Sequence, residues 1–598
     1  MHMLDDTSGR RAAVAPTLAV GLALAIALAG CPASPPPAAS KRSRGAGAAR
    51  AELALVNGRI FTARSDSELV AALAIGNGRV LAVGSRAAIA AHIGAGTRVV
   101  DLGGRFVAPG FHDAHMHLQS AGDALARLDL SGLRSLDDVL AKVRAAVAKR
   151  PAGAWIVGRG WDQTLWKGWH PAQKDARWPT RADLDRVAPR HPVALARIDG
   201  HVLWLNSAAL ARAGISAKSA DPSGGTIVRE GKSRQPSGIL EEKATALVRI
   251  GEGGGVAAAR QALLRALQRA RRRGVTSVCE LGSSLDALLA LEREGKLTAR
   301  VTLWTSLGSD LSAATARRAK LAAHAQARAR AGGAALVRLG ALKGFVDGTL
   351  GSRTAALLEP YADKPGSRGT LRQPPGVLEA QVLAASRAGF QIALHAIGDR
   401  AVRRALDTYA KLAPAARARL RHRVEHVQVI APADVPRFAK LSVIASLQPC
   451  HLSTDQRWVE KRLGAARAAE RGYRWRALAS AGARIALGTD WPVEPVDPLR
   501  NLFAAITRRR VETPAVVGWH AEQALAFGQA LRAYSAGSAY ATHVEARRGT
   551  LAPGMDADLV VFDRDLWSAV AKSPRALLDA RVSATLLAGK VVYGKLGR

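Results

Sequence analysis

The chain has few cysteines and few aromatic residues for its length. Among its 598 residues there are 3 Cys, and aromatic residues make up 5%. Cys31 lies in an N-terminal segment, so only Cys279 and Cys450 remain, which excludes a disulfide framework as the source of stability. The fold must instead depend on a large apolar core, which a hydrophobic content of 48% can supply.

Acidic residues are also scarce. Asp and Glu number 48 against 86 Lys and Arg, so the formal net charge is +38. Such a charge raises the question of a nucleic-acid or anionic-membrane partner. The basic residues are, however, scattered through Ala-rich stretches such as 257–273, with no interleaved aromatic residues and no recognisable reading motif. The composition indicates a solvated basic surface, and we expect no nucleic-acid partner.

One hydrophobic run near the N-terminus suggests a targeting segment. It covers residues 12–29, follows Arg10 and Arg11, and is interrupted by Pro16. A basic start and an apolar run short for a bilayer span are typical of a signal peptide. An uncleaved signal or a transmembrane helix is the alternative.

The end of this run resembles the lipobox of bacterial lipoproteins, because small residues lead directly into Cys31. In such proteins the cysteine is lipidated and becomes the mature N-terminus. We therefore expect a lipoprotein signal peptide over 1–31 and a flexible linker over 32–50. This predicts a protein of the bacterial cell envelope, lipid-anchored to the membrane on the periplasmic or extracytoplasmic face.

The two ends of the remaining chain are rich in β-strand patterns. Short alternating segments with Asn-Gly turns predict strands over 51–107, and a similar pattern returns over 546–598. Two β-rich ends around one long α/β stretch predict that the ends combine in a composite β-sandwich domain.

Eight apolar, β-prone runs lie within the α/β stretch, several of them separated by helical stretches, as a (β/α)8 TIM barrel requires. The runs are 106–111, 275–281, 300–305, 337–345, 390–395, 422–426, 441–448 and 483–490. We expect the first barrel strand within 108–118 and the remainder of the barrel over 255–545. The long gap between them predicts an inserted subdomain over 119–254, because a compact barrel cannot carry so long a structureless connection.

The predicted insertion is rich in tryptophan. It contains half of the 12 Trp of the chain, at Trp155, Trp161, Trp166, Trp169, Trp178 and Trp204. An insertion after a barrel strand would lie over the C-terminal face of the barrel, where active sites of this fold are found. Trp161 and its neighbours therefore either form an aromatic lid that contacts a substrate or pack as the insertion's own core.

The most informative local motif follows the first apolar run. His115 and His117 are two residues apart, so in an extended chain they point the same way and two imidazoles can bind one metal ion. A Pro-Gly pair at 109–110 and Asp113 precede them, which makes the motif more specific than an isolated His-x-His.

Other candidate ligands fall on later runs. Lys343 lies within the fourth run, and His395 ends the fifth. His426 ends the sixth run and Asp490 ends the eighth. Side chains at the C-terminal ends of different barrel strands converge on one mouth. We therefore predict that these four residues meet the histidine pair around a cation.

Seven phrases are distinctive as a set. They cover 109–117, 343–355, 395–399, 423–426 and 488–492, with 158–162 and 199–201 in the insertion. Together they resemble the YtcJ-like branch of the amidohydrolases (amidohydrolase family 3), which includes N-substituted formamide deformylase. The resemblance extends from about residue 53 to 592. It implies a metal-dependent barrel enzyme with a composite β domain.

The resemblance implies a role for each imidazole. His115 and His117 would bind the more buried metal ion, and His395 and His426 the second. Asp490 matches an aspartate that binds metal and moves protons in this superfamily.

Lys343 matches a lysine that is often carboxylated in this superfamily and bridges two ions. An ammonium group has no lone pair to offer a cation, whereas a carbamate supplies two anionic oxygens. A mononuclear site and a structural ion pair, with Asp347 as the candidate partner, remain alternatives. Zinc is the favoured divalent ion, because imidazole and carboxylate ligands suit it, although Mn, Fe, Co or Ni could bind such a set.

The expected reaction is hydrolysis of a small-molecule substrate by a metal-activated water. Asp490 would accept the proton of the water and return it to the leaving nitrogen, as general base and then general acid. We expect cleavage of an amide or N-acyl/N-formyl C–N bond. An ester or lactone hydrolase on the same site and a non-catalytic ligand-binding lipoprotein are the alternatives.

Three further residues are candidates for substrate contact besides Trp161. His201 and His451 lie in family-like phrases, and packing is the alternative role for each. Arg353 either holds a substrate oxygen or braces its loop. Cys450 is not expected to be a nucleophile, because the metal already generates one.

Overall fold

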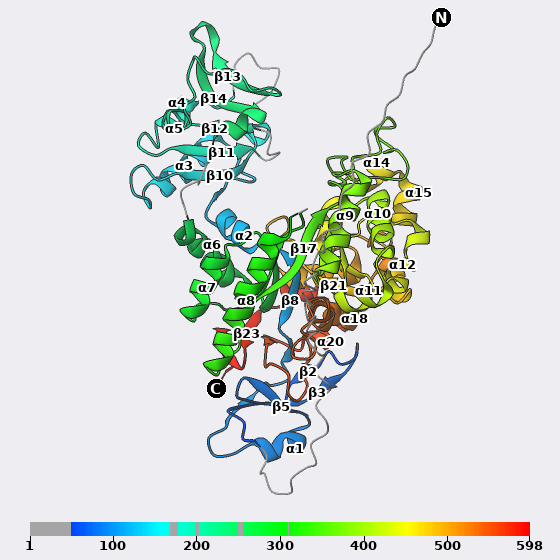
Figure 1. Ribbon diagram of the computed structural model, residues 1–598. Helices are drawn as coiled ribbons and strands as arrows, with labels where there is room; N and C mark the ends of the chain where they lie inside the picture. The colour runs from blue at the N-terminus through cyan, green and yellow to red at the C-terminus, as the bar shows by residue number, and fades with distance from the viewer. Residues whose placement is uncertain (1–48, 168–177, 198–201, 249–254, 309, 598) are drawn as a thin grey trace, which may run out of the picture. The chain divides into compact units, whose positions relative to one another are not determined.

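The computed structural model describes residues 49–167, 178–197, 202–248, 255–308 and 310–597 (Figure 1). The expected signal peptide, Cys31 and nearly all of the expected linker lie outside these residues. Within the described part of the chain, no helix has the length and apolar character needed to cross a membrane.

Eight parallel strands form the central sheet. In spatial order they are β8 (Phe111–Met116), β15 (Val275–Leu281), β16 (Arg300–Ser306), β17 (Val337–Phe345), β18 (Ile392–Ala396), β19 (Arg423–His426), β20 (Ile444–Leu447) and β21 (Arg484–Leu487). The first and last strands meet just beyond β21, where the amide of Asp490 donates to the carbonyl of His115 (2.7 Å). The amide of His117 donates to the carbonyl of Trp491 (2.8 Å). The (β/α)8 barrel expected from the sequence is confirmed.

Helices follow the strands of the barrel along the chain. They are α2 (Leu118–Leu125), α6 (Gly255–Arg271), α7 (Leu285–Arg293), α8 (Ser312–Arg330), α9 (Pro375–Arg387), α10 (Asp399–Ala410), α11 (Pro414–Leu420), α12 (Arg437–Lys440), α13 (Pro449–Asp455), α14 (Val459–Leu463), α15 (Ala465–Arg471), α16 (Trp475–Ser480), α17 (Pro498–Thr507), α18 (Phe527–Arg532) and α19 (Ser538–Ala541). Helix α10 shows why they form: Val402, Leu406 and Tyr409 recur at helical spacing and are fully buried, so one face packs on the barrel.

The predicted strand over 106–111 is two strands in two different sheets. Strand β7 (Phe106–Pro109) belongs to the β-sandwich, where Ala108 pairs with Val560, and the barrel strand β8 begins only at Phe111. Gly110 lies at the crossing, and a Cβ there would lie 2.3 Å from the side chain of Thr276. Hydrophobicity along the chain could not reveal this division, because both strands are buried.

Both ends of the chain build the other two sheets of this part of the fold. One has the order β5-β4-β1-β6, from β1 (Leu53–Val56), β4 (Ala72–Gly76), β5 (Arg79–Gly84) and β6 (Arg98–Asp101). The other has the order β24-β23-β22-β7-β2-β3, from β2 (Arg59–Phe61), β3 (Leu69–Val70), β22 (Leu559–Phe562), β23 (Val582–Leu587) and β24 (Lys590–Gly594) together with β7. Leu55, Val100, Leu559 and Leu586 share one buried core, so the β domain is composite.

The stretch between β8 and β15 holds a fourth sheet, of order β13-β14-β12-β11-β10-β9. Its elements are β9 (Leu128–Asp129), α3 (Leu136–Val147), β10 (Ile156–Trp161), α4 (Arg181–Asp185), β11 (Val193–Arg197), β12 (Val202–Leu205), α5 (Ser207–Arg212), β13 (Gly225–Glu230) and β14 (Gln235–Glu242). Trp161 is fully buried here, with its ring 5.7 Å from that of Trp204 and 6.2 Å from that of Trp166. Of the two roles considered for these tryptophans, the described ones pack as the core of the insertion.

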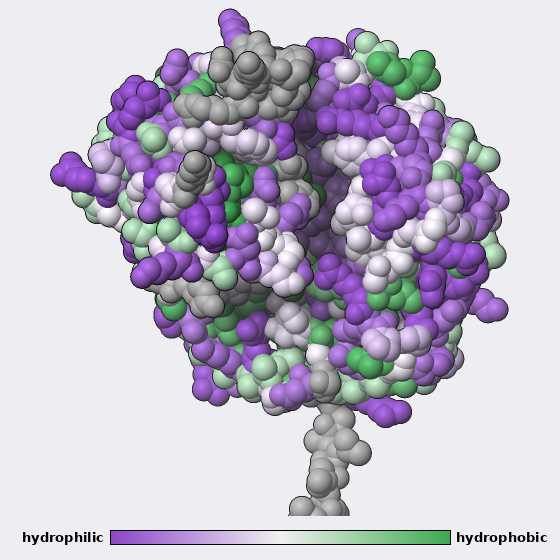
Figure 2. Space-filling model, turned by 90° about the horizontal axis from the view of Figure 1, so that it is seen from above, coloured by the Kyte–Doolittle hydropathy of each residue, from purple (hydrophilic) through white to green (hydrophobic). Residues whose placement is uncertain are grey.

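The surface in view in Figure 2 is mainly hydrophilic, and hydrophobic residues form only scattered patches on it. This agrees with the solvated surface expected from the composition.

Candidate metal centre

Histidines and an aspartate from several barrel strands line one cavity of about 420 Å³. The sequence-predicted residues that line it are His115, His117, Lys343, His395, His426, His451 and Asp490. They come from β8, β17, β18, β19, α13 and the segment after β21. Residues up to 375 positions apart in the chain, His115 and Asp490, therefore share one site at the C-terminal ends of the strands.

The ligand atoms in this cavity are spaced for one cation. Oδ1 of Asp490 lies 3.2 Å from Nε2 of His117 and 3.5 Å from Nε2 of His115. One candidate ligand atom each from His115, His426 and Asp490 lies within 4.8 Å of the others. Two atoms that bind one zinc ion at about 2.1 Å in tetrahedral geometry are about 3.4 Å apart. The arrangement therefore fits a divalent ion.

Several buried polar atoms of the cavity lack a hydrogen-bond partner. They are Nδ1 of His426, Nε2 of His451 and Oδ1 of Asp490, which is close to His117 but not in hydrogen-bond geometry. Buried polar atoms are nearly always satisfied, so three exceptions in one cavity need an explanation. A bound cation supplies one for His426 and Asp490, which are candidate ligands, whereas His451 is not in the ligand set that the resemblance implies.

The backbone is strained at two of the candidate ligands. His426 has a φ of 79° and Asp490 a φ of 57°, in the left-handed region that residues other than glycine rarely adopt. Such strain persists only where the surrounding structure enforces it, and it clusters at functional sites. Here the chain turns at the end of β19 and just after β21, and both side chains line the cavity.

Glu425 orients His115 from below the cavity. Oε2 of Glu425 lies 2.7 Å from Nδ1 of His115, which leaves Nε2 free to face the cavity. Glu425 also accepts from Nε of Arg423 at 2.5 Å, and both side chains are fully buried. Burial opposes ionisation of Glu425, but the Arg423 guanidinium holds its pKa well below the usual range. Sequence reasoning missed this pair, although two charged residues within a run expected to be a barrel strand are a signal for it, because charged residues are rarely buried without a partner.

Asp113 connects the first strand of the barrel to the segment that carries Asp490. It accepts hydrogen bonds from the hydroxyl (2.7 Å) and the amide (3.0 Å) of Thr489 and from the amide of His115 (3.2 Å). Burial raises the pKa of Asp113 to about 7. Asp113 therefore positions both His115 and Asp490 without lining the cavity itself.

Burial acts in opposite directions on Asp490 and Lys343. Desolvation alone would raise the pKa of Asp490, but the facing imidazoles, His115 first, hold it well below its usual range. Desolvation lowers the pKa of Lys343 to about 8. Nζ of Lys343 lies 3.3 Å from Nε2 of His115. The alternative of an ion pair with Asp347 is not seen among the described contacts, because Asp347 accepts instead from three backbone amides.

His395 and His451 lie beside His426. The His395 ring is 4.5 Å from that of His426, and its Nε2 is 2.9 Å from the carbonyl of Gly348. The His451 ring stacks on His426 at 5.7 Å, its Nδ1 lies 3.0 Å from Nε2 of Gln428, and its Nε2 lies 3.4 Å from Oδ2 of Asp490. His451 is therefore in direct contact with two of the candidate ligands, His426 and Asp490.

The remaining candidates lie elsewhere or outside the described residues. Arg353 is partly exposed and pairs with Asp363 at 2.9 Å, so it braces its loop and is not among the described residues that line the cavity. Trp161 is in the insertion core, and His201 lies outside the described residues. Cys450 is buried, and burial raises its thiol pKa well above the usual value, as expected of a residue that is not a nucleophile.

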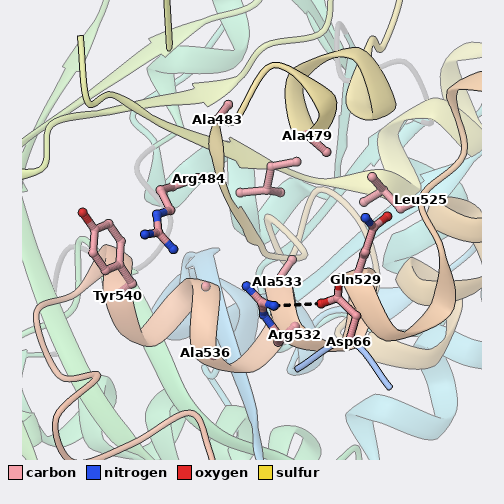
Figure 3. A pocket seen from close by; sticks show the side chains of 13 residues that line it. Asp66, Ala479, Ala483, Arg484, Leu525, Gln529, Arg532, Ala533, Ala536 and Tyr540 are labelled. Atoms are coloured by element: carbon pink, nitrogen blue, oxygen red, sulfur yellow. Dashed lines mark ion pairs between the residues drawn. The ribbon is translucent and has the colours of Figure 1, made fainter. Parts of the chain in front are cut away.

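A second cavity, of about 350 Å³, lies beside the start of β21 (Figure 3). Its lining includes Arg484, Gln529 and Tyr540, and its acidic residue Asp66 pairs with Arg532 at 3.0 Å. The described lining residues include no histidine or cysteine, so this cavity does not offer a comparable ligand set.

Sequence comparisons point to one family. The profile of the Amidohydrolase family matches residues 98–593. The chain is 35% identical to the protein LONG AFTER FAR-RED 3 of Arabidopsis thaliana, over 91% of this chain and 92% of that protein. It is 32% identical to the putative amidohydrolase YtcJ of Bacillus subtilis (strain 168), over 83% and 91%. It is 27% identical to the N-substituted formamide deformylase of Arthrobacter pascens, over 83% and 90%.

A solved structure supports the same grouping. An uncharacterized metal-dependent hydrolase from Pyrococcus horikoshii superposes with a TM-score of 0.67 and 29% identity, and the match covers 86% of this chain and 97% of that protein.

Proposed function

Because the chain belongs to the amidohydrolase family and is a hydrolase, we propose that it cleaves the C–N bond of an amide or N-acyl/N-formyl substrate with the help of a divalent metal ion. The observation that carries the proposal is the convergence of His115, His426 and Asp490 ligand atoms within 4.8 Å in one cavity. The relative named N-substituted formamide deformylase supports the choice of bond.

The residues that would hold the metal follow from the cavity. His115, His117 and Asp490 form one group of donors, His395 and His426 a second, and Lys343 lies beside His115. A divalent ion, for which these ligands favour zinc, would supply an activated water and polarise the substrate carbonyl when bound. The volume of about 420 Å³ leaves room for a small-molecule substrate beside the donors.

Asp490 carries the proton transfer in this proposal. Its pKa is held well below the usual range, so at neutral pH it is ionised and can accept a proton from the attacking water. It then returns the proton to the leaving nitrogen. Oδ2 of Asp490 lies 3.4 Å from Nε2 of His451, so the imidazole adjoins the carboxylate without a hydrogen bond.

Lys343 is suited to carboxylation. A carbamate forms only from the neutral amine, and burial lowers the pKa of Lys343 to about 8, so part of the population is neutral at physiological pH. The carbamate oxygens would then extend the ligand set from β17 toward both groups of histidines.

The N-terminal segment completes the proposal. The basic start, the apolar run over 12–29 and the small residues before Cys31 support lipidation of Cys31 and attachment to the extracytoplasmic face of the cell envelope. Replacing Cys31 with serine should abolish the incorporation of a labelled fatty acid into the protein, and unchanged labelling would contradict the anchor.

The test of the function uses metal-loaded protein and a panel of N-formyl amines and N-acyl amines, with esters and lactones alongside. Wild-type protein should contain about one or two divalent ions per chain and release amines. The Asp490→Asn variant should retain most of its metal and lose at least about 1000-fold in kcat. Protein without bound metal, or undiminished turnover by Asp490→Asn, would refute the proposal, and turnover of esters alone would refute the choice of bond.

A further inference from the structure

Two carboxyl groups of the cavity lining have no lysine or arginine partner in the described part of the chain. Asp455, at the end of α13, and Glu494, after β21, both line the cavity. Asp455 accepts from the hydroxyl of Tyr473, and Glu494 accepts from the hydroxyl of Thr454 at 2.5 Å.

Other carboxyl groups of the chain are compensated in one of two ways. Glu425 and Asp558 pair with Arg423 at 2.5 Å and with Arg300 at 2.6 Å, whereas Asp347, which has no lysine or arginine partner among the described contacts, accepts from three backbone amides. Asp455 and Glu494 are partly exposed to the cavity, and each accepts a single hydroxyl hydrogen bond among the described contacts. Burial raises the pKa of both Asp455 and Glu494, because neither carboxylate is compensated by a cation. Such carboxyl groups lower the stability of the fold unless a ligand supplies a positive charge or hydrogen-bond donors, so their place in the cavity points to a ligand.

A second observation points to the same space. The side chain of His451 is 9% exposed, and its Nε2 makes no hydrogen bond although it faces the cavity that the carboxyl groups line. The cavity therefore holds an unsatisfied polar atom in addition to the two acids. Buried polar atoms are nearly always paired, so this atom points to a ligand group at the same place.

Much of the remaining lining is apolar. Phe345, Leu350, Ile397, Trp458 and Val493 contribute to it. Phe345 and Val493 are 37% and 67% exposed, so a ligand in the cavity can cover them. A ligand that covers these side chains and reaches the acids must combine an apolar body with a cationic group.

We infer that the substrate of the proposed hydrolysis carries a protonated amine on an apolar body, and that Asp455 and Glu494 bind this amine while the scissile bond lies at the histidine cluster. This inference rests on the proposed function and names the substrate class. The two acids are specificity-determining residues: they take no part in bond cleavage.

Matched substrates test it. N-acetyl-1,5-diaminopentane carries a terminal ammonium, and N-hexylacetamide replaces that ammonium by a methyl group at the same chain length; the N-formyl pair is the second series. Wild-type protein should prefer the cationic member of a pair in kcat/KM by about 10- to 100-fold. The Asp455→Asn/Glu494→Gln double variant should lose this preference, mainly through KM, and should retain its metal content and its activity on the neutral member.

The control removes two acids far from the cavity lining. Asp286→Asn/Glu379→Gln eliminates two exposed carboxylates that pair with Lys320 and Lys411 on the surface. It should leave the preference unchanged. Equal loss in the control would show that net charge, not the acids of the cavity, selects the substrate, and would overturn the inference.

A binding measurement gives a readout that does not require turnover. Calorimetric titration with hexylamine should give a dissociation constant about 10-fold or more lower in wild-type protein than in the double variant, whereas 1-hexanol should bind both equally. Hydrolysis of both members of each pair with equal efficiency would overturn the inference and leave the proposed function intact. Hydrolysis of neither, with no binding of hexylamine, would overturn both, and loss of metal in the double variant would show that the acids are ligands instead.

Discussion

Replacement of Glu425 by glutamine tests whether the buried Glu425–Arg423 pair controls the metal site through His115. Glu425 is fully buried, lies 2.7 Å from Nδ1 of His115, and accepts from Arg423 at 2.5 Å. Glutamine keeps the shape but removes the charge. The Arg423 guanidinium then remains buried without its counter-charge. The imidazole loses its anionic acceptor, because the amide offers only a neutral oxygen and can also turn its NH2 group toward the ring.

Two magnitudes follow. Breaking one side of a buried ion pair costs about 3–5 kcal/mol of stability. Losing a carboxylate that orients a ligating histidine weakens metal binding about 10- to 100-fold. Because Arg423 also donates to Ser446 and to the carbonyl of Ala114, the cost in stability should lie at the lower end of that range.

The two effects are separated by measuring them in different states. Chemical denaturation of metal-free protein reports the cost of the unpaired charge, and titration against a competing chelator reports the metal affinity. The Arg423→Met/Glu425→Leu variant should recover most of the stability, since both charges are gone, but not the affinity. If the Glu425→Gln variant were within about 1 kcal/mol of wild-type stability and had unchanged metal affinity, the proposed role of the Glu425–Arg423 pair would be refuted.

Three further outcomes are expected. Lys343→Ala should reduce the metal content measured by mass spectrometry, and added acetate should partly restore activity, because a carboxylate can replace the oxygens of a carbamate; unchanged metal content would contradict carboxylation. Gly110→Ala should lower the unfolding midpoint, at a cost of about 1–3 kcal/mol or more, because the new Cβ would lie 2.3 Å from the Thr276 side chain. Gly366→Ala is the control and should leave the midpoint unchanged, because no heavy atom lies within 4 Å of a Cβ there. Equal midpoints for the two variants would show that the crossing at Gly110 tolerates a side chain. Prolonged chelation should abolish turnover, and zinc should restore it to treated wild-type protein but not to Asp490→Asn; turnover that survives complete metal removal would exclude the metal-activated water.

Much of the barrel could be predicted from local pattern alone. Strands β15 (275–281) and β17 (337–345) have the predicted bounds, and five others differ from the predicted runs by at most three residues at an end. The first run, 106–111, is the exception, because the barrel strand β8 begins only at Phe111. Parallel strands in a barrel are buried on both faces, which is why their sequences contain the short apolar runs that reveal them. The split at Gly110 could not be predicted, since hydrophobicity does not reveal that a buried chain leaves one sheet and enters another.

The residues of the cavity also divide into those that the sequence could predict and those that it could not. His115 and His117 were recognisable from spacing, because alternation in a strand is a local property. Asp455 and Glu494 were not, because an unpaired acid is recognised only by what surrounds it, and in sequence both stand close to arginines that do not face them. Trp161 differs from both, because the sequence showed that it lies in a tryptophan-rich segment but not that its side chain is buried in the core of the insertion.

Sequence by itself therefore determined the positions of the strands, the family-like phrases and most of the donor set, since each depends on the order of neighbouring residues. Tertiary structure decided which buried charges are compensated, which tryptophans are core, and which side chains share the cavity with the histidines. The physical reason is that compensation and burial are properties of contacts between distant segments, and these contacts form only when the barrel closes between β8 and the segment after β21.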